Sequence, residues 1–288
     1  MLKQRIITAV ALLVVALAAL FYLSANGLAI AVGLVVWVAG WEWSKFCLLV
    51  NKLQRALFAS VITAAFAGLC WQVPPQSLEA ISSLPPYLLS VLIIGCLWWV
   101  AAVILVFSFP KSAVIWKSQT VLKFIAGLMT LLPFAIAVVL LRSTHAEKYG
   151  VWYGAELLLI VLAMVWAADS GAYFTGKQFG KRKLMPKVSP GKTIEGMLGG
   201  LCSAALVALG GAWTLKVAPS DWGYFVLASV LAVLASVFGD LAESMFKRQA
   251  GIKDSGRILP GHGGVLDRID SLTAALPVFA LCYWLWIG

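Results

Sequence analysis

Charged side chains are scarce in this 288-residue sequence, at 12% of all residues, whereas 62% of the residues are hydrophobic. A soluble domain carries about 25% charged residues. A water-soluble fold of this size is therefore excluded, because the chain cannot cover its surface with polar groups. The apolar residues come in long blocks and lack the alternation of membrane β-strands. The composition predicts an all-α polytopic membrane protein.

Histidine and cysteine are also few, with two and five residues respectively, and no two cysteines form a CxxC pair. We interpret the cysteines as buried, unreactive thiols rather than redox or metal centres. His145 is predicted to lie on the outer side of the membrane, away from any chemistry. His262 stands alone in a glycine-rich turn, where a hydrogen-bonding role is more common than catalysis.

Nine apolar blocks make up most of the chain, and most approach the roughly 20 residues that a membrane-spanning helix needs. The first is interpreted as a retained helix, since a second block follows at once and no convincing cleavage site precedes a soluble domain. The Pro-rich segment 73–86 is expected to be a short outer loop. The blocks cover residues 6–23, 27–46, 55–72, 88–107, 121–141, 151–168, 196–216, 222–240 and 270–287.

The basic residues predict the orientation of these helices. If the N-terminus is cytoplasmic, nineteen Lys and Arg residues fall on the inner side and only Arg142, Lys148 and Lys216 on the outer side. Positive charge accumulates on the cytoplasmic side of membrane proteins. We therefore expect a cytoplasmic N-terminus and an outer C-terminus.

The polar residues divide the chain unevenly, although no linker separates soluble domains. Residues 1–150 are expected to anchor the protein, with possible dimer or lipid contacts, and residues 151–288 to carry the chemistry within the same structural unit. Two predicted cytoplasmic segments, 169–195 and 240–270, hold eleven of the twenty-two basic residues. Polar groups beside membrane helices are functional candidates.

Segment 240–270 contains acidic residues at helical spacing. Asp240 is followed by Glu243, Ser244 and Lys247 at i+3, i+4 and i+7, which places all four on one face of a helix that continues from block 222–240. Asp267 and Asp270 share a face at the start of the last block. A Gly/Pro turn between the two helices can bring their ends together. Three converging aspartates would repel one another without a cation, and hard oxygen ligands suit Mg²⁺.

The same segment offers groups that bind phosphate. The backbone of Gly261, Gly263 and Gly264 can approach a phosphate closely and donate N–H groups. Positive charge for phosphoryl oxygens comes from four basic side chains, Lys247, Arg248, Lys253 and Arg268. The combination predicts a Mg²⁺-assisted phosphoryl or nucleotidyl transfer site.

Segment 169–195 begins with Asp169 and ends with a Ser-Pro-Gly-Lys-Thr string. Ser189 can cap a helix with Pro190 at its first position, which would direct the helix N-terminus, Lys192 and Thr193 toward an anion. A P-loop is excluded, because the position of its first glycine holds Pro186 and no buried strand precedes it. Taken alone, a basic loop can be a topology determinant and paired acids can cap a helix. Only the joint arrangement favours a site.

The stretch from Ser244 to Asp270 resembles the signature of phosphatidate cytidylyltransferases, also called CDP-diacylglycerol synthases. The family pattern has Ser-x-apolar-Lys-Arg, then Lys-Asp-x-small, then apolar-Pro-Gly-His-Gly-Gly-apolar-x-Asp-Arg-apolar-Asp, and every specified position is met here. The Asp169-Ser-Gly and Ser189–Thr193 strings are also similar to the family. The motifs span roughly the C-terminal 120 residues.

The resemblance implies that CTP and phosphatidate react to give CDP-diacylglycerol and pyrophosphate. It further implies Mg²⁺ with a second cation such as K⁺, a homodimer, no nucleic acid partner, and a bacterial inner membrane with the site facing the cytoplasm. Asp240, Asp267 and Asp270 would hold the metal centre, and Ser244 and Lys247 would contact phosphates. The nucleophile is a phosphate oxygen already ionised at neutral pH, so no His or Cys dyad is needed.

Two alternatives remain open. An ion-coupled transporter needs acidic residues in the middle of several spans, whereas Glu42 and Glu156 lie nearer block ends. Another lipid phosphoryl or nucleotidyl transferase, such as a polyprenol kinase, would share much of the chemistry. A CDP-alcohol phosphotransferase is disfavoured because its Asp-Gly-x-x-Ala-Arg motif is absent.

Overall fold

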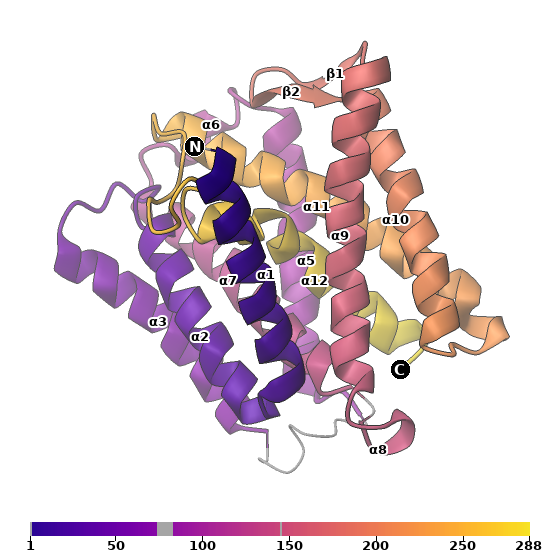
Figure 1. Ribbon diagram of the computed structural model, residues 1–288. Helices are drawn as coiled ribbons and strands as arrows, with labels where there is room; N and C mark the ends of the chain where they lie inside the picture. The colour runs from indigo at the N-terminus through magenta and orange to yellow at the C-terminus, as the bar shows by residue number, and fades with distance from the viewer. Residues whose placement is uncertain (1, 74–82, 145) are drawn as a thin grey trace.

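The computed structural model describes residues 2–73, 83–144 and 146–288, which form a bundle of long helices with one small hairpin (Figure 1). His145 and most of the predicted Pro-rich outer loop lie outside these residues. The elements are α1 (Leu2–Tyr22), α2 (Ala25–Trp43), α3 (Lys52–Trp71), α5 (Pro86–Phe107), α6 (Ala113–Trp116), α7 (Thr120–Arg142), α8 (Ala146–Tyr149), α9 (Tyr153–Phe179), β1 (Lys183–Met185), β2 (Ser189–Thr193), α10 (Ile194–Thr214), a 3₁₀ turn η1 (Pro219–Asp221), α11 (Trp222–Gln249) and α12 (Leu266–Trp286).

Within the described ranges, eight helices are long and apolar enough to cross a membrane, and the apolar part of α1, Ile6–Tyr22, is shorter. The prediction of an all-α polytopic membrane fold is confirmed. Each of the nine predicted blocks coincides with a long helix. The helix that contains Asp240, α11, continues beyond the block to Gln249, as expected.

One boundary differs substantially from the sequence prediction. Residues 169–179, expected to belong to a loop, extend α9 to Phe179. The physical reason is close packing against α10. A Cβ atom on Gly200 would lie 2.7 Å from the Ala168 carbonyl oxygen, and one on Gly196 would lie 2.8 Å from that of Ala172. Small residues allow two membrane helices to approach in this way, and the contact stabilises polar turns that hydrophobicity alone would not predict as helix.

Helix α7 forms the centre of the bundle. It packs against α2, α3, α5, α9 and α12, and every residue from Thr130 to Leu141 is buried. A helix that is apolar on all sides is stable only inside a protein or in lipid. Helices α2 and α3 lie on one flank of the bundle and α9 and α10 on the other, while α1 lies between α2 and α9 (Figure 1).

The hairpin corrects a second prediction. Strands β1 and β2 pair antiparallel, with Lys183 opposite Thr193 and Met185 opposite Ser189. Ser189 therefore lies in a strand and caps no helix. The N-cap of α10 is Thr193, whose hydroxyl accepts a hydrogen bond from the Gly196 N–H at 3.1 Å. An exposed strand in a two-stranded hairpin tolerates Pro190, which lacks an N–H group.

The polar segments gather at one end of the bundle. The hairpin, the loop between α11 and α12 and the beginning of α1 lie at this end, whereas the chain's C-terminus lies toward the opposite end (Figure 1). Both candidate segments therefore share one end of the molecule.

Candidate active site

The site is built on the close approach of α11 and α12. A Cβ atom on Gly239 would lie 2.7 Å from the Asp270 carbonyl oxygen and 3.0 Å from the Ala274 Cβ, so the glycine permits the contact. Asp240 follows directly on α11, and Asp270 lies opposite on α12. The predicted meeting of the two helix ends is thus achieved by backbone contact, and Gly239 is a residue that sequence reasoning missed.

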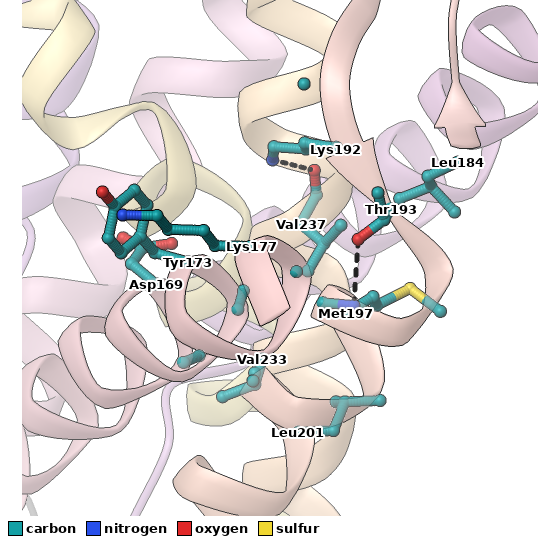
Figure 2. Close-up of a pocket in the computed structure, with 16 residues that line it drawn as sticks. Asp169, Tyr173, Lys177, Leu184, Lys192, Thr193, Met197, Leu201, Val233 and Val237 are labelled. Atoms are coloured by element: carbon teal, nitrogen blue, oxygen red, sulfur yellow. Dashed lines mark hydrogen bonds between the residues drawn. The ribbon is translucent and has the colours of Figure 1, made fainter. Parts of the chain in front are cut away.

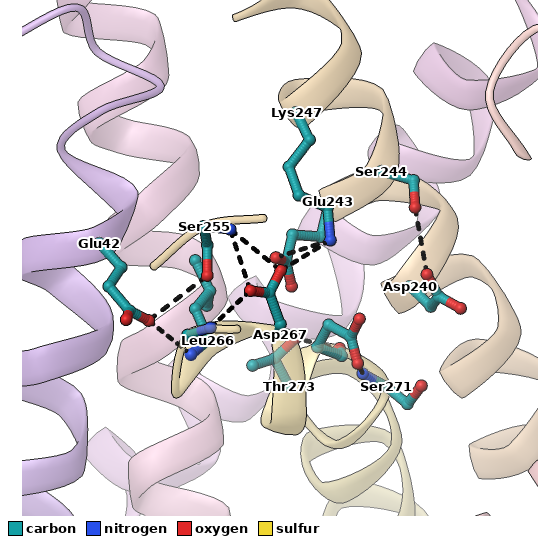
Figure 3. A network of polar contacts seen from close by, with 12 residues as sticks. Glu42, Asp240, Glu243, Ser244, Lys247, Ser255, Leu266, Asp267, Ser271 and Thr273 are labelled. Carbon is teal, nitrogen blue, oxygen red and sulfur yellow. Dashed lines mark hydrogen bonds and ion pairs between the residues drawn. The ribbon is translucent and has the colours of Figure 1, made fainter. Parts of the chain in front are cut away.

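Lys247 links the carboxylates of the two helices. Its Nζ lies 3.2 Å from Glu243 Oε1, one turn earlier on α11, and 2.9 Å from Asp267 Oδ1 on α12 (Figure 3). Both carboxylates are buried. A buried carboxyl group is costly without a paired charge or hydrogen bonds, and the Lys247 ammonium group lies within ion-pair distance of two of them at this interface.

Asp267 also organises the loop before α12. Its Oδ2 accepts hydrogen bonds from the backbone N–H groups of Ser255 at 2.9 Å and Gly264 at 2.8 Å. Gly263 adopts φ +85°, and a Cβ atom there would lie 2.7 Å from Asp267 Oδ2. The signature glycines therefore allow the loop to fold around this carboxylate, in the left-handed conformation that glycine tolerates.

Segment 169–195 joins the same site through Lys192. The Nζ of Lys192 in β2 lies 2.7 Å from Asp240 Oδ2, and the Ser244 hydroxyl donates to Asp240 Oδ1 at 3.2 Å. A further link comes from Arg248, whose Nε donates to the Val188 carbonyl at 3.3 Å. The two polar segments, about fifty residues apart in the sequence, are therefore in direct contact.

The joined segments enclose a polar cavity of about 460 Å³ between α9, α11 and α12. It brings together most of the predicted charged site residues and adds Asp254, which sequence reasoning passed over. The lining residues are Val165, Trp166, Asp169, Asp240, Lys247, Asp254, Asp267, Arg268, Asp270, Ser271 and Leu272.

A second cavity of about 460 Å³ lies between α9, α10, α11 and the hairpin. Its lining is mainly apolar, and Asp169 belongs to both cavities. In Figure 2, Lys192 lies toward one end of this cavity and Leu201 and Val233 toward the other. An apolar volume therefore adjoins a charged one.

Other predicted substrate-binding residues lie around the cavities without lining the polar one. Thr193 lines the apolar cavity as the cap of α10. Ser189 is half-buried in β2, and Lys253 is exposed in the loop. Gly261 and His262 form a turn closed by the His262 N–H, which donates to the Leu259 carbonyl at 3.0 Å.

The carboxylates offer the hard oxygen donors that suit Mg²⁺. In the part of the chain that the structure describes, however, no three His, Cys, Asp or Glu side chains are gathered closely enough to hold a metal ion as they stand. Asp240 is paired with Lys192, and Asp267 is surrounded by N–H donors and Lys247. Asp270 accepts a hydrogen bond from the Ser271 N–H at 2.7 Å. The assignment of three aspartates to one metal centre stays a prediction, with the donor chemistry in its favour.

Glu42 is the main polar residue of this region that sequence reasoning did not assign to the site. It lies at the end of α2, is buried, and contacts the loop between α11 and α12. Lys45, just beyond α2, donates to the Ser255 carbonyl, and burial lowers the pKa of its ammonium group. The sequence did contain a signal for this residue, because a carboxylate within an apolar block is a candidate for a functional role.

Comparison with known proteins gives consistent matches. The family model described as "Cytidylyltransferase family" matches residues 3–286. A "Phosphatidate cytidylyltransferase" of Haemophilus influenzae is 44% identical over 287 residues, covering 99% of both chains. A protein of the same name from Pseudomonas aeruginosa is 42% identical over 285 residues, covering 99% of this chain and 97% of the relative. One from Brucella suis is 48% identical over 129 residues, covering 45% and 47%.

Proposed function

Because this chain belongs to the cytidylyltransferase family, we propose that its polar cavity is the place where the cytidylyl group of CTP is transferred to phosphatidate. The chain is an integral membrane cytidylyltransferase that forms CDP-diacylglycerol. The observation that supports this location is the cavity itself, in which aspartates and basic side chains from three helices face one another. The ion-coupled transporter is no longer needed to explain the acidic residues.

The reaction requires the protein to align two polyanions. A phosphate oxygen of phosphatidate attacks the α-phosphorus of CTP, a new P–O bond forms, and the bond to the β-phosphate oxygen breaks to release pyrophosphate. The attacking phosphate monoester is ionised at neutral pH, so positioning and charge neutralisation carry most of the catalysis. Lys192, Lys247 and Arg268 supply positive charge beside the cavity.

We propose that the enzyme depends on Mg²⁺, with Asp240, Asp267 and Asp270 as its carboxylate donors, and that a second cation such as K⁺ contributes. When bound, Mg²⁺ neutralises phosphoryl oxygens and orients them. Lys192 and Lys247 now pair with two of these aspartates. If the aspartates held Mg²⁺ in place of these lysines, both ammonium groups would be close enough to turn toward substrate phosphates.

We assign the apolar cavity to the lipid substrate. Its lining of α9, α10 and α11 side chains suits the glycerol backbone and the first carbons of the acyl chains, and Lys177 and Lys192 lie at its rim. Because Asp169 borders both cavities, a lipid held there would present its phosphate to the polar cavity. CTP would occupy the polar side.

We further propose that the site faces the cytoplasm of a bacterium from its inner membrane, and that the protein is a homodimer. The positive-inside distribution supports the orientation. Of the three basic residues assigned to the outer side, Arg142 and Lys148 belong to α7 and α8, and Lys216 follows the end of α10. Cross-linking of the protein in native membranes tests the dimer.

The assay that tests the function uses purified protein in detergent with CTP labelled at the α-phosphate. Phosphatidate should yield labelled CDP-diacylglycerol with equimolar pyrophosphate, and a polyprenol should yield no labelled lipid. Transfer to the polyprenol with none to phosphatidate would contradict the proposal. Parallel reactions with and without Mg²⁺ and K⁺ test the cation requirement separately.

A further inference from the structure

Glu42 stands at the C-terminal end of α2, far in the sequence from the signature segment Ser244–Asp270. The residue is 1% exposed. Its Oε2 accepts a hydrogen bond from the Leu266 backbone N–H at 2.8 Å and one from the Ser255 hydroxyl at 3.4 Å (Figure 3). A buried carboxylate from the first half of the chain thus contacts the loop between α11 and α12 at Ser255, within the loop, and at Leu266, where α12 begins.

The Leu266 N–H belongs to the first residue of α12, where backbone N–H groups lack partners within the helix. The N-cap residue Val265 has no side chain that can accept them. Glu42 therefore caps α12 from another helix, and its negative charge also suits the positive end of the helix dipole. The helix that it caps carries Asp267 and Asp270.

Two glycines of the loop fit around the same carboxylate. A Cβ atom on Gly256 would overlap Glu42 Oε1, and one on Gly264 would lie 2.5 Å from Glu42 Oε2. Ser255, the neighbour of Gly256, is also held by Asp267, which accepts a hydrogen bond from the Ser255 N–H. Glu42, the loop and Asp267 consequently form one connected unit.

We propose that Glu42 is a positioning residue for the transfer reaction. It fixes the start of α12 and the Ser255 segment, and through the Ser255 N–H it sets the orientation of the Asp267 carboxylate. The effect of Glu42 on the transfer reaction rests on the proposed function, whereas the contact between Glu42 and the loop is independent of it. It assigns residues 1–150 a part in the site as well as in the membrane anchor.

Three substitutions separate geometry from charge. Glu42→Ala should lower kcat by about 10- to 100-fold, because small misplacements of aligned groups cost that much, and should raise the KM for CTP. Glu42→Gln should retain activity within about threefold, because the amide oxygen still accepts the Leu266 N–H. Glu42→Asp should behave like Glu42→Ala, since its carboxylate is one methylene short. Wild-type kinetics in Glu42→Ala, or equal losses in Glu42→Gln and Glu42→Ala, would overturn the proposal.

A stability control uses Leu157→Ala, which removes a fully buried side chain near the start of α9. This variant should lower the thermal midpoint without raising the KM for CTP, because loss of folded protein leaves the remaining sites intact. If Glu42→Ala also lowered only the thermal midpoint and the apparent kcat, Glu42 would be a stability residue and the proposal would fail.

Limited trypsin digestion tests the coupling without any activity. Lys253 and Arg257 are exposed in the loop, and Lys181 and Lys183 are exposed at the hairpin as internal references. Glu42→Ala should speed cleavage after the loop residues about fivefold relative to the hairpin, the factor expected when a typical helix cap is lost. Equal relative cleavage in Glu42→Ala and wild type would overturn the coupling even if CTP proved not to be the substrate.

A double-mutant cycle provides the final test. Gly256→Ala should reduce activity strongly in the wild-type background, because the added Cβ overlaps Glu42 Oε1. In the Glu42→Ala background the same change should cost much less, because the overlap with Glu42 is removed and only the contact of the added Cβ with the Gly264 Cα, at 3.0 Å, is left. Full additivity of the two losses would contradict the contact on which the proposal depends.

Discussion

Removal of the Lys247 ammonium group is the most informative change at the candidate site. The Lys247 side chain is 11% exposed, and those of its partners Glu243 and Asp267 are 3% and 6% exposed. Lys247→Met keeps the aliphatic stem and deletes the charge. Two carboxylates would then share a buried interface with no paired cation.

Two general magnitudes apply to this variant. Leaving a buried ion pair without one partner costs about 3–5 kcal/mol of folding stability. Loss of a preorganised positive group beside the transferring phosphoryl costs about 2–4 kcal/mol of transition-state stabilisation, by analogy with an oxyanion donor. The second figure corresponds to about a 30- to 1000-fold lower rate. We therefore expect Lys247→Met to lose both stability and turnover.

A second variant separates the two effects. In Lys247→Met/Glu243→Gln, one buried charge is neutralised, and Asp267 still accepts N–H groups from Ser255 and Gly264. The double variant should regain most of the lost thermal stability. It should not regain activity, because the positive charge beside the substrate phosphates is still missing.

The assay combines a thermal midpoint in detergent with CDP-diacylglycerol formation from labelled CTP, normalised to folded protein. Lys52→Ala, at the exposed start of α3, is the matched control and should be nearly silent in both measurements. Normal turnover in Lys247→Met would refute the assignment of Lys247 to the site. Recovery of turnover together with stability in the double variant would show that Lys247 only stabilises the fold.

Three further predictions concern the metal ligands, the apolar cavity and the orientation of the chain. Asp270→Asn should fold normally, and its turnover and its apparent affinity for Mg²⁺ should both be lower. Asp267→Asn should show the same losses and also a lower thermal midpoint, because its amide would face N–H donors. Normal turnover and normal Mg²⁺ dependence in either variant would contradict the metal assignment. Leu201→Trp, which fills part of the apolar cavity, should raise the KM for phosphatidate and leave that for CTP unchanged, and the reverse pattern would place the lipid elsewhere. A phosphatase fused to the C-terminus should be active outside the cytoplasm and a fluorescent fusion dark; the opposite result would invert the orientation.

The hydrophobic blocks predicted the helices well, because the bilayer demands about 20 apolar residues for each span and leaves few other structures available. The helical spacing of Asp240 and Lys247 likewise predicted that both side chains share one face of a helix, since side-chain periodicity in a helix follows from its geometry alone. The same reasoning failed for residues 169–179 and for Ser189. The polarity of residues 169–179 indicated a loop, but packing against α10 makes them helical. The Ser-Pro pair at Ser189 indicated a helix cap, but pairing with β1 makes it part of a strand.

The sequence by itself determined the class of protein, the run of spans and the dense signature from Ser244 to Asp270. Only the tertiary structure decided which partners the charges have. Lys192 reaches Asp240 across about fifty residues, and Glu42 reaches Leu266 across more than two hundred. Such contacts depend on how helix backbones approach, as at Gly239 against Asp270, and a one-dimensional pattern carries no information about that approach. The low-dielectric interior then makes each pairing matter, because a buried charge without its partner is costly.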